Sequence, residues 1–164
     1  MPITDSLLTW IHMLSASIWV GGSIFIGIVL APMLKSLANT VEERIILMIK
    51  IGRRFNMVAV PALAVLVATG IYNANTFIAS PNTMLHTTYG TILVVKMALV
   101  ASMIAVFGIH VKISGLNIEQ ELNMHNPSSV DICRLRTRII WLGRVIVGQS
   151  VAILLLAAML NSGV

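Results

Sequence analysis

The sequence contains a single cysteine, Cys133, and few charged residues. One cysteine cannot form a disulfide within the chain, and there is no Cys-x-x-Cys pair for a metal or redox centre. Charged residues make up 10% of the chain, whereas hydrophobic residues make up 57%. A soluble domain of 164 residues leaves much of its surface in water and cannot hide so many apolar side chains. We therefore expect most of the chain to lie in lipid.

Several functional motifs are also missing. There is no catalytic triad, no P-loop and no zinc-type spacing of cysteine and histidine, so these motifs do not indicate an enzyme, and a redox role stays open only with the haem alternative below. The N-terminal residues "MPITDS" lack the basic region and cleavage site of a signal peptide, and the first apolar run is therefore expected to stay as a membrane span. The net charge of +5 comes from basic residues beside apolar segments, which indicates membrane topology and not nucleic-acid binding.

Four long apolar runs are present. Each is long enough to cross a hydrocarbon core about 30 Å thick as a helix, and none shows the alternation of a strand. The predicted spans are residues 6–34, 55–78, 89–111 and 139–160. The predicted fold is an all-α integral membrane four-helix bundle that forms a single domain over residues 1–164.

Two joining segments predict helical extensions before the second and fourth spans. Thr40 and Glu43 have the spacing of a capping box, so a helix is expected to begin there and to run into the second span. Ser128, with Asp131 three residues later, is a candidate cap for a helix leading into the fourth span.

The basic residues predict the orientation. All but Lys96 lie in or beside the first and third joints, which the positive-inside rule places in the cytoplasm. These residues are Lys35, Arg44, Lys50, Arg53, Arg54, Lys112, Arg134, Arg136, Arg138 and Arg144. We therefore expect a multi-pass protein of the plasma membrane, with both helical extensions cytoplasmic and with both termini and the 79–88 loop outside.

Two ionisable side chains lie at matching depth inside the predicted spans. His12 is about 8 Å below the outer end of the first span, and Lys96 is about 10 Å into the third. His12 shares a helical stripe with Trp19, and Lys96 shares one with Met103 and His110. Because an ionisable group in hydrocarbon costs about 2.5 kcal/mol or more, the pair predicts an interior site.

Further side chains are expected near this site. Trp19, Tyr72, Asn73 and Tyr89 are predicted to support it, and Tyr72 and Asn73 are assigned to the same face as Thr69. Imidazole and thioether groups suit copper, and imidazole also suits haem iron. The candidate copper ligands are His12, Met13, Met84 and His86. The candidate axial ligands for a b-type haem are His12 and Lys96.

Three structural alternatives stay open. His12 can simply donate a hydrogen bond to a carbonyl of a neighbouring helix. Lys96 can extend its ammonium to the outer headgroups. The polar residues of the second span can hold helices together, which is their commoner use in membranes. In that case the protein is an accessory subunit of a larger membrane complex.

Three segments have a distinctive pattern: "IHMLSASIWVGG" (11–22), "RRFNMVAVPALAVLVATGIYNA" (53–74) and "YGTILVVKMALV" (89–100). Together they resemble the CopD family of copper-resistance and copper-import membrane proteins. The resemblance implies a multi-helix plasma-membrane protein that takes copper inward, with a periplasmic copper-binding CopC-like partner. The matching positions are His12, Trp19, Gly21, Gly22, Gly70, Tyr72, Tyr89, Gly90 and Lys96.

The chain departs from longer CopD proteins in two respects. Those proteins have about twice as many helices, and this chain resembles their C-terminal half without a fused CopC-like β-domain. A complete copper pathway is therefore expected to need a homo-oligomer. A shorter similarity to HemJ, a haem-associated membrane oxidase, involves the first-helix histidine and the third-helix lysine. It supports the haem alternative with His12 and Lys96.

Overall fold

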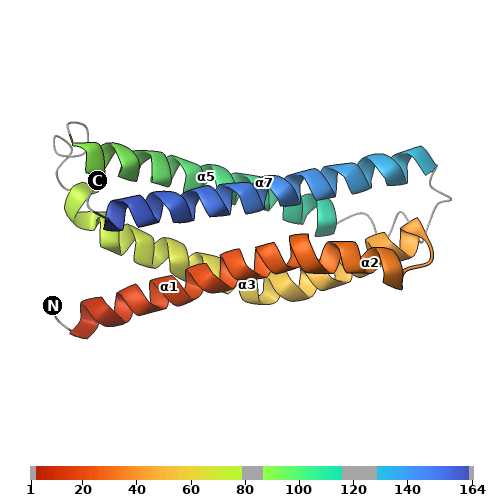
Figure 1. Cartoon of the computed structure of the whole chain (residues 1–164), viewed down its shortest axis with the longest axis horizontal. Coiled ribbons are helices and arrows are strands. Elements are labelled where there is room, and N and C mark those ends of the chain that lie inside the picture. The colour runs from red at the N-terminus through yellow and green to blue at the C-terminus, as the bar shows by residue number, and fades with distance from the viewer. Residues whose placement is uncertain (1–2, 79–86, 116–128, 163–164) are drawn as a thin grey trace.

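The computed structural model describes residues 3–78, 87–115 and 129–162, and these are helical except for short turns (Figure 1). The helices are α1 (Ile3–Ile24), a π-helical segment η1 (Phe25–Leu30), α2 (Ala31–Leu37), α3 (Val41–Ile78), α5 (Thr88–Gly115) and α7 (Ser129–Asn161). Four candidate membrane spans lie within them, at 3–37, 43–74, 88–114 and 137–161. The predicted all-helical fold with four spanning helices is confirmed.

The first span is one continuous helix with a change of winding near its middle. Pro32 has no N–H and cannot bond to the carbonyl of Ile28. Just before it the register changes, and the N–H of Ala31 bonds to the carbonyl of Ile26, five residues back. The wider π-helical turn therefore precedes a residue that cannot continue the α-helical bond pattern.

The extension before the second span begins at the expected cap. The N–H of Glu43 donates to Thr40 Oγ1 at 3.1 Å, and Glu43 Oε2 accepts from the N–H groups of Asn39 and Thr40. This is the reciprocal capping box that the sequence predicted. At the third span, Thr87 Oγ1 accepts from the N–H of Gly90 and caps the first turn of α5. α7 likewise begins ahead of the fourth span, whereas Ser128 lies outside the described residues.

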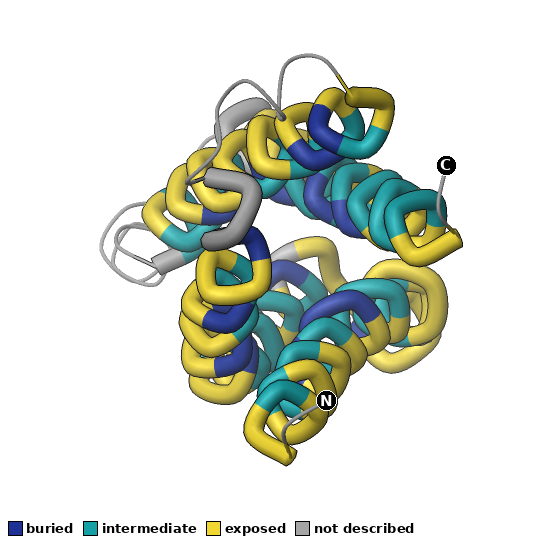
Figure 2. Tube along the Cα trace, turned by 90° about the vertical axis from the view of Figure 1, so that its left-hand side faces the viewer, coloured by how far each residue is buried: buried dark blue, intermediate teal, exposed yellow. Residues whose placement is uncertain are grey.

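The helices pack as two close pairs, α1 with α3 and α5 with α7, joined by weaker α1–α7 and α3–α5 contacts. Both termini lie at the same end of the bundle (Figure 1). Viewed nearly end-on, buried residues face one another and exposed residues face outward (Figure 2). Such an arrangement brings the inward stripes of all four spans together.

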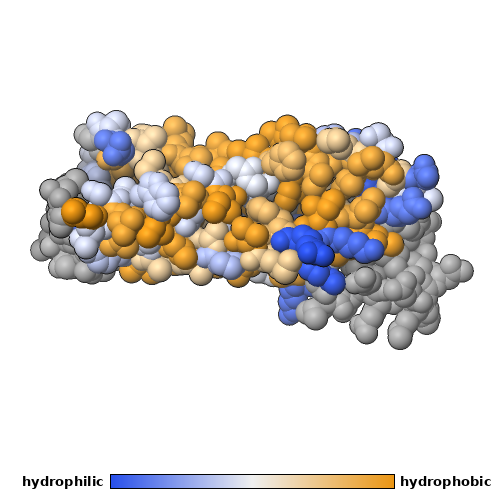
Figure 3. Space-filling model, turned by 90° about the horizontal axis from the view of Figure 1, so that it is seen from below, coloured by the Kyte–Doolittle hydropathy of each residue, from blue (hydrophilic) through white to orange (hydrophobic). Residues whose placement is uncertain are grey.

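The outer surface is apolar over most of its length (Figure 3). Large hydrophobic side chains such as Phe25, Ile28, Met57 and Leu155 are exposed on it. An exposed apolar belt of this size is what a lipid-facing surface requires. Hydrophilic side chains gather in the half of the molecule where α2 ends and α3 begins (Figure 3). Exposed cations in that half of the bundle include Lys35, Lys50, Arg53 and Arg54.

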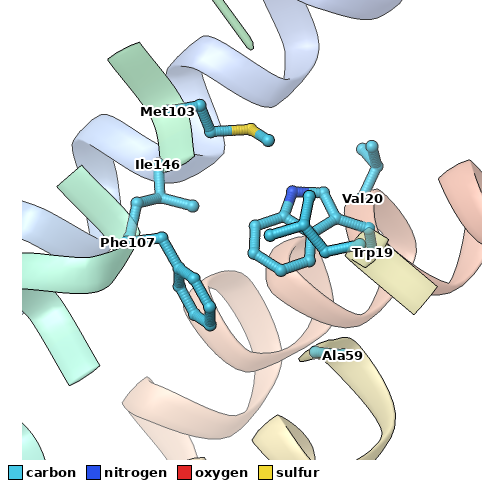
Figure 4. Close-up of a cluster of buried hydrophobic side chains, with 7 residues drawn as sticks. Trp19, Val20, Ala59, Met103, Phe107 and Ile146 are labelled. Carbon is cyan, nitrogen blue, oxygen red and sulfur yellow. The ribbon is translucent and has the colours of Figure 1, made fainter. Parts of the chain in front are cut away.

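One hydrophobic cluster occupies the middle of the bundle (Figure 4). Its centre is Trp19, whose ring meets Phe107 edge-on, with centroids 4.8 Å apart and an interplanar angle of 82°. The other buried members are Val20, Ala59, Leu63, Met103 and Ile146. Since these residues come from all four spans, the cluster fixes the level at which the helices meet.

Candidate metal site

His12 lies on the inward face of α1, one and two turns from the buried Ser15 and Trp19. Its Nδ1 is 2.8 Å from Oγ1 of Thr69, which is buried on α3. This hydrogen bond joins α1 and α3 within the membrane-spanning part of both helices. It also determines which ring nitrogen of His12 can act as a ligand.

Thr69 already uses its hydroxyl proton within α3. Oγ1 is 2.7 Å from the carbonyl oxygen of Val65 and 3.2 Å from that of Leu66. A hydroxyl has one proton and two lone pairs, so Oγ1 accepts a hydrogen bond from His12 Nδ1–H. In the neutral ring the lone pair then lies on Nε2. A histidine held through Nδ1–H with Nε2 free has the arrangement of a metal ligand.

Gly70 gives the imidazole room. A Cβ atom added at Gly70 would lie 3.5 Å from Cε1 of His12, an ordinary van der Waals contact. The ring therefore lies against the α3 backbone, and a branched or long side chain at this position would displace it. Two consecutive α3 residues, Thr69 and Gly70, thus fix the orientation of His12.

Lys96 lies on the inward face of α5. It is half-buried and follows the buried Leu93, and Met103 continues the same face. Within the described ranges no hydrogen bond or ion pair involves the ammonium group of Lys96. His12 and Lys96 are therefore both half-buried on the inward faces of their helices.

A second polar contact lies deeper in the bundle. Trp19 is 1% exposed, and its Nε1–H donates to Ser150 Oγ on α7 at 3.1 Å. Ser150 Oγ is also 2.8 Å from the carbonyl of Ile146 and 3.4 Å from Sδ of Met103. The sequence predicted Trp19 as a supporting residue but gave no role to Ser150. The polar pair Gln149–Ser150 within an apolar span was the signal that could have identified it.

Other predicted site residues lie elsewhere. Met13 is 64% exposed on the outward side of α1, because consecutive helical residues point about 100° apart, so it does not join His12. Tyr72 is 56% exposed and Asn73 is also exposed, whereas Thr69 is buried, so the expected common face does not form. Tyr89 is half-buried at the start of α5. Met84 and His86 lie outside the described residues.

The described part of the chain contains no group of three or more His, Cys, Asp or Glu side chains able to hold a metal ion. A zinc-like or calcium-like cage is therefore not formed by those residues. Donors of another kind are present: the free imidazole nitrogen of His12 and the thioether of Met103. Such neutral donors suit a metal that accepts few, soft ligands.

Comparison with known proteins supplies an independent line of evidence. A sequence model of the CopD family, described as copper resistance protein D, matches residues 49–160. The copper transport protein CutJ of Bacillus subtilis (strain 168) is 32% identical over 104 residues, which cover 63% of this chain and 18% of CutJ. The chain thus spans less than a fifth of that relative's length. No solved structure matches the chain.

The family match takes in Thr69, Lys96, Met103 and Ser150, whereas His12 precedes it. It covers well over half of the chain, and the resemblance seen in the sequence is confirmed. Together with the four apolar spans, it shows that the chain is a multi-pass membrane protein of the CopD family.

Proposed function

We propose that this protein binds copper inside the four-helix bundle near its extracytoplasmic end and passes it inward across the membrane. The observation that carries the proposal is the contact between His12 Nδ1 and Thr69 Oγ1, which assigns the ligand role to Nε2, in a chain of the CopD family. The name of the CutJ relative, a copper transport protein, supports the same cargo.

The chemistry of the spans favours copper over harder cations. The sequence has no Asp or Glu between residues 44 and 118 or beyond residue 131. A cation inside the bundle therefore meets imidazole, thioether and hydroxyl groups and no carboxylate. Magnesium and calcium need oxygen ligands, whereas copper in its monovalent state accepts thioether and imidazole.

The topology proposed with this function follows the positive-inside rule. Both termini and the 79–88 loop face outward, and the helical extensions before the second and fourth spans lie in the cytoplasm. In this orientation His12 is reached from outside the plasma membrane. Met84 and His86 in the outer loop are proposed to deliver copper to it. A CopC-like periplasmic protein is the proposed donor, and a homo-oligomer the proposed complete pathway.

Copper binding by the purified full chain tests the proposal. Anaerobic titration with Cu(I) should give saturable binding, and His12→Gln should remove the outer site. Met13→Leu is the matched control, because Met13 adjoins His12 in sequence but faces outward. If the His12 variant binds copper as tightly as the unchanged protein, the proposed site is wrong.

A second candidate function is binding of b-type haem between His12 and Lys96. The observation that favours it is that these two half-buried, inward-facing groups come from different helices. An axial histidine from one helix with a partner from another is the arrangement that a membrane b-haem uses. Purification after expression with added haem decides between the two. A Soret band that Lys96→Leu abolishes would support haem, and its absence would exclude this alternative.

A further inference from the structure

The inward face of α5 presents two more donor groups below Lys96. Met103 and His110 follow it at intervals of seven residues, so each is displaced by about 10 Å along the helix on nearly the same face. Met103 is 2% exposed, and Phe107 between the two is also buried. The Nδ1 atom of His110 is buried as well. This face therefore carries donors through the depth of the bundle.

The sulfur of Met103 has one long contact, with Ser150 Oγ at 3.4 Å. Ser150 Oγ accepts from Trp19 Nε1–H and has one proton to donate. The carbonyl of Ile146, at 2.8 Å, is the closer and stronger acceptor for that proton than Sδ of Met103, at 3.4 Å. At least one lone pair of the thioether is therefore available to a metal ion in the middle of the bundle.

His110 has a buried ring nitrogen, Nδ1, that makes no hydrogen bond with the described residues. Buried polar atoms without a partner are rare, and a missing ion is one of their explanations. The helical packing explains the neighbouring apolar residues of this face but gives this nitrogen no partner.

We propose that Met103 and His110 are the second and third binding positions for Cu(I) on its way through the bundle, after His12. The inference rests on the proposed function and assigns its interior path. No carboxylate lies along this face, so only neutral donors meet the ion, and thioether and imidazole are those that bind Cu(I). The Met103 side chain has three rotatable bonds with which to approach an ion from either side.

The aromatic pair Trp19–Phe107 lies at the step between the two positions. Its edge-on contact fills the centre of the bundle, and Met103 lies on one side of it (Figure 4). An ion that moves along α5 from Met103 to His110 therefore passes this pair of rings.

The test is Cu(I) binding and uptake by the full chain in liposomes, with Cu(I) supplied directly under anaerobic conditions. Met103→Leu conserves volume and should lose one bound ion and lower the uptake rate at least tenfold. Met97→Leu, at an exposed position on the same helix, is the matched control and should change neither quantity. His110→Gln should slow uptake similarly without weakening binding at His12. It is an independent variant should the Met103 change impair folding.

The outcomes separate the two proposals. If the unchanged protein binds no Cu(I), the proposed function fails, and this inference fails with it. If His12→Gln abolishes binding and uptake while Met103→Leu and His110→Gln leave both as in the unchanged protein, copper follows another path. The inference alone is then overturned.

Discussion

Nδ1 of His12 on α1 and Oγ1 of Thr69 on α3 are 2.8 Å apart, and this contact sets the chemical state of the imidazole. Thr69 donates its hydroxyl proton in a hydrogen bond to the carbonyl oxygen of Val65. The ring proton of His12 is therefore on Nδ1, and the lone pair is on Nε2. Partners of this kind orient a ligand and fix its tautomer in metal sites. Thr69 is therefore a positioning residue for His12.

Thr69→Val should weaken copper binding about 10- to 100-fold, because the imidazole loses the acceptor that fixes Nδ1–H. Thr69→Ser keeps the hydroxyl and should bind copper like the unchanged protein. Titration of both variants with Cu(I) against a competing chelator measures the effect. Equal affinities for Val and Ser would show that the hydroxyl does not position the ligand.

Gly22 and Gly21 should respond differently to alanine. A Cβ at Gly22 would overlap the ring of Phe55 on α3, whereas one at Gly21 meets nothing within 4 Å. Gly22→Ala should therefore destabilise the fold by about 1–3 kcal/mol through overpacking. Gly21→Ala should be neutral or slightly stabilising, since alanine favours helix. Unfolding in mixed detergent measures both, and similar losses would contradict the close α1–α3 approach.

The bond between Trp19 and Ser150 should appear as a coupling free energy between α1 and α7. In a cycle of Trp19→Phe, Ser150→Ala and the double variant, we expect about 0.6 kcal/mol and at most about 1.7 kcal/mol. The readout is the free energy of unfolding. Strictly additive single changes would mean that the indole N–H gains nothing from Ser150.

The topology can be tested with single cysteines in a Cys133→Ser background. Ser162 and Ser36 are both exposed, near opposite ends of the bundle. Ser162→Cys should react with a membrane-impermeant maleimide in intact cells, and Ser36→Cys only after permeabilisation. The reverse pattern would invert the proposed orientation and place His12 near the cytoplasm.

The sequence was sufficient to predict the spans and the inward faces of α1 and α5. Length and hydropathy define a span, and positions seven apart share a face, so His12 and Lys96 point inward as expected. The capping box at Thr40 could also be predicted, because it depends only on residues three or four positions apart.

Other features depend on how the helices pack against one another, which the spacing of residues in the sequence does not determine. Met13 was chosen for its sulfur, although a neighbour of an inward residue turns away by about 100°. Tyr72 was grouped with Thr69, whereas the rotation of α3 against α1 buries Thr69 and Ala74 and exposes Tyr72. The π-helical turn at Phe25–Leu30 reflects a local response to Pro32 within a continuous helix, which the apolar pattern does not reveal.

The most direct test of the central claim is elemental analysis together with an absorption spectrum of one purified sample, compared with His12→Gln. If the inward imidazole of His12 is a copper ligand, the unchanged protein contains copper and no Soret band, and His12→Gln contains less copper while keeping its helical content. Equal copper in both samples would contradict the account.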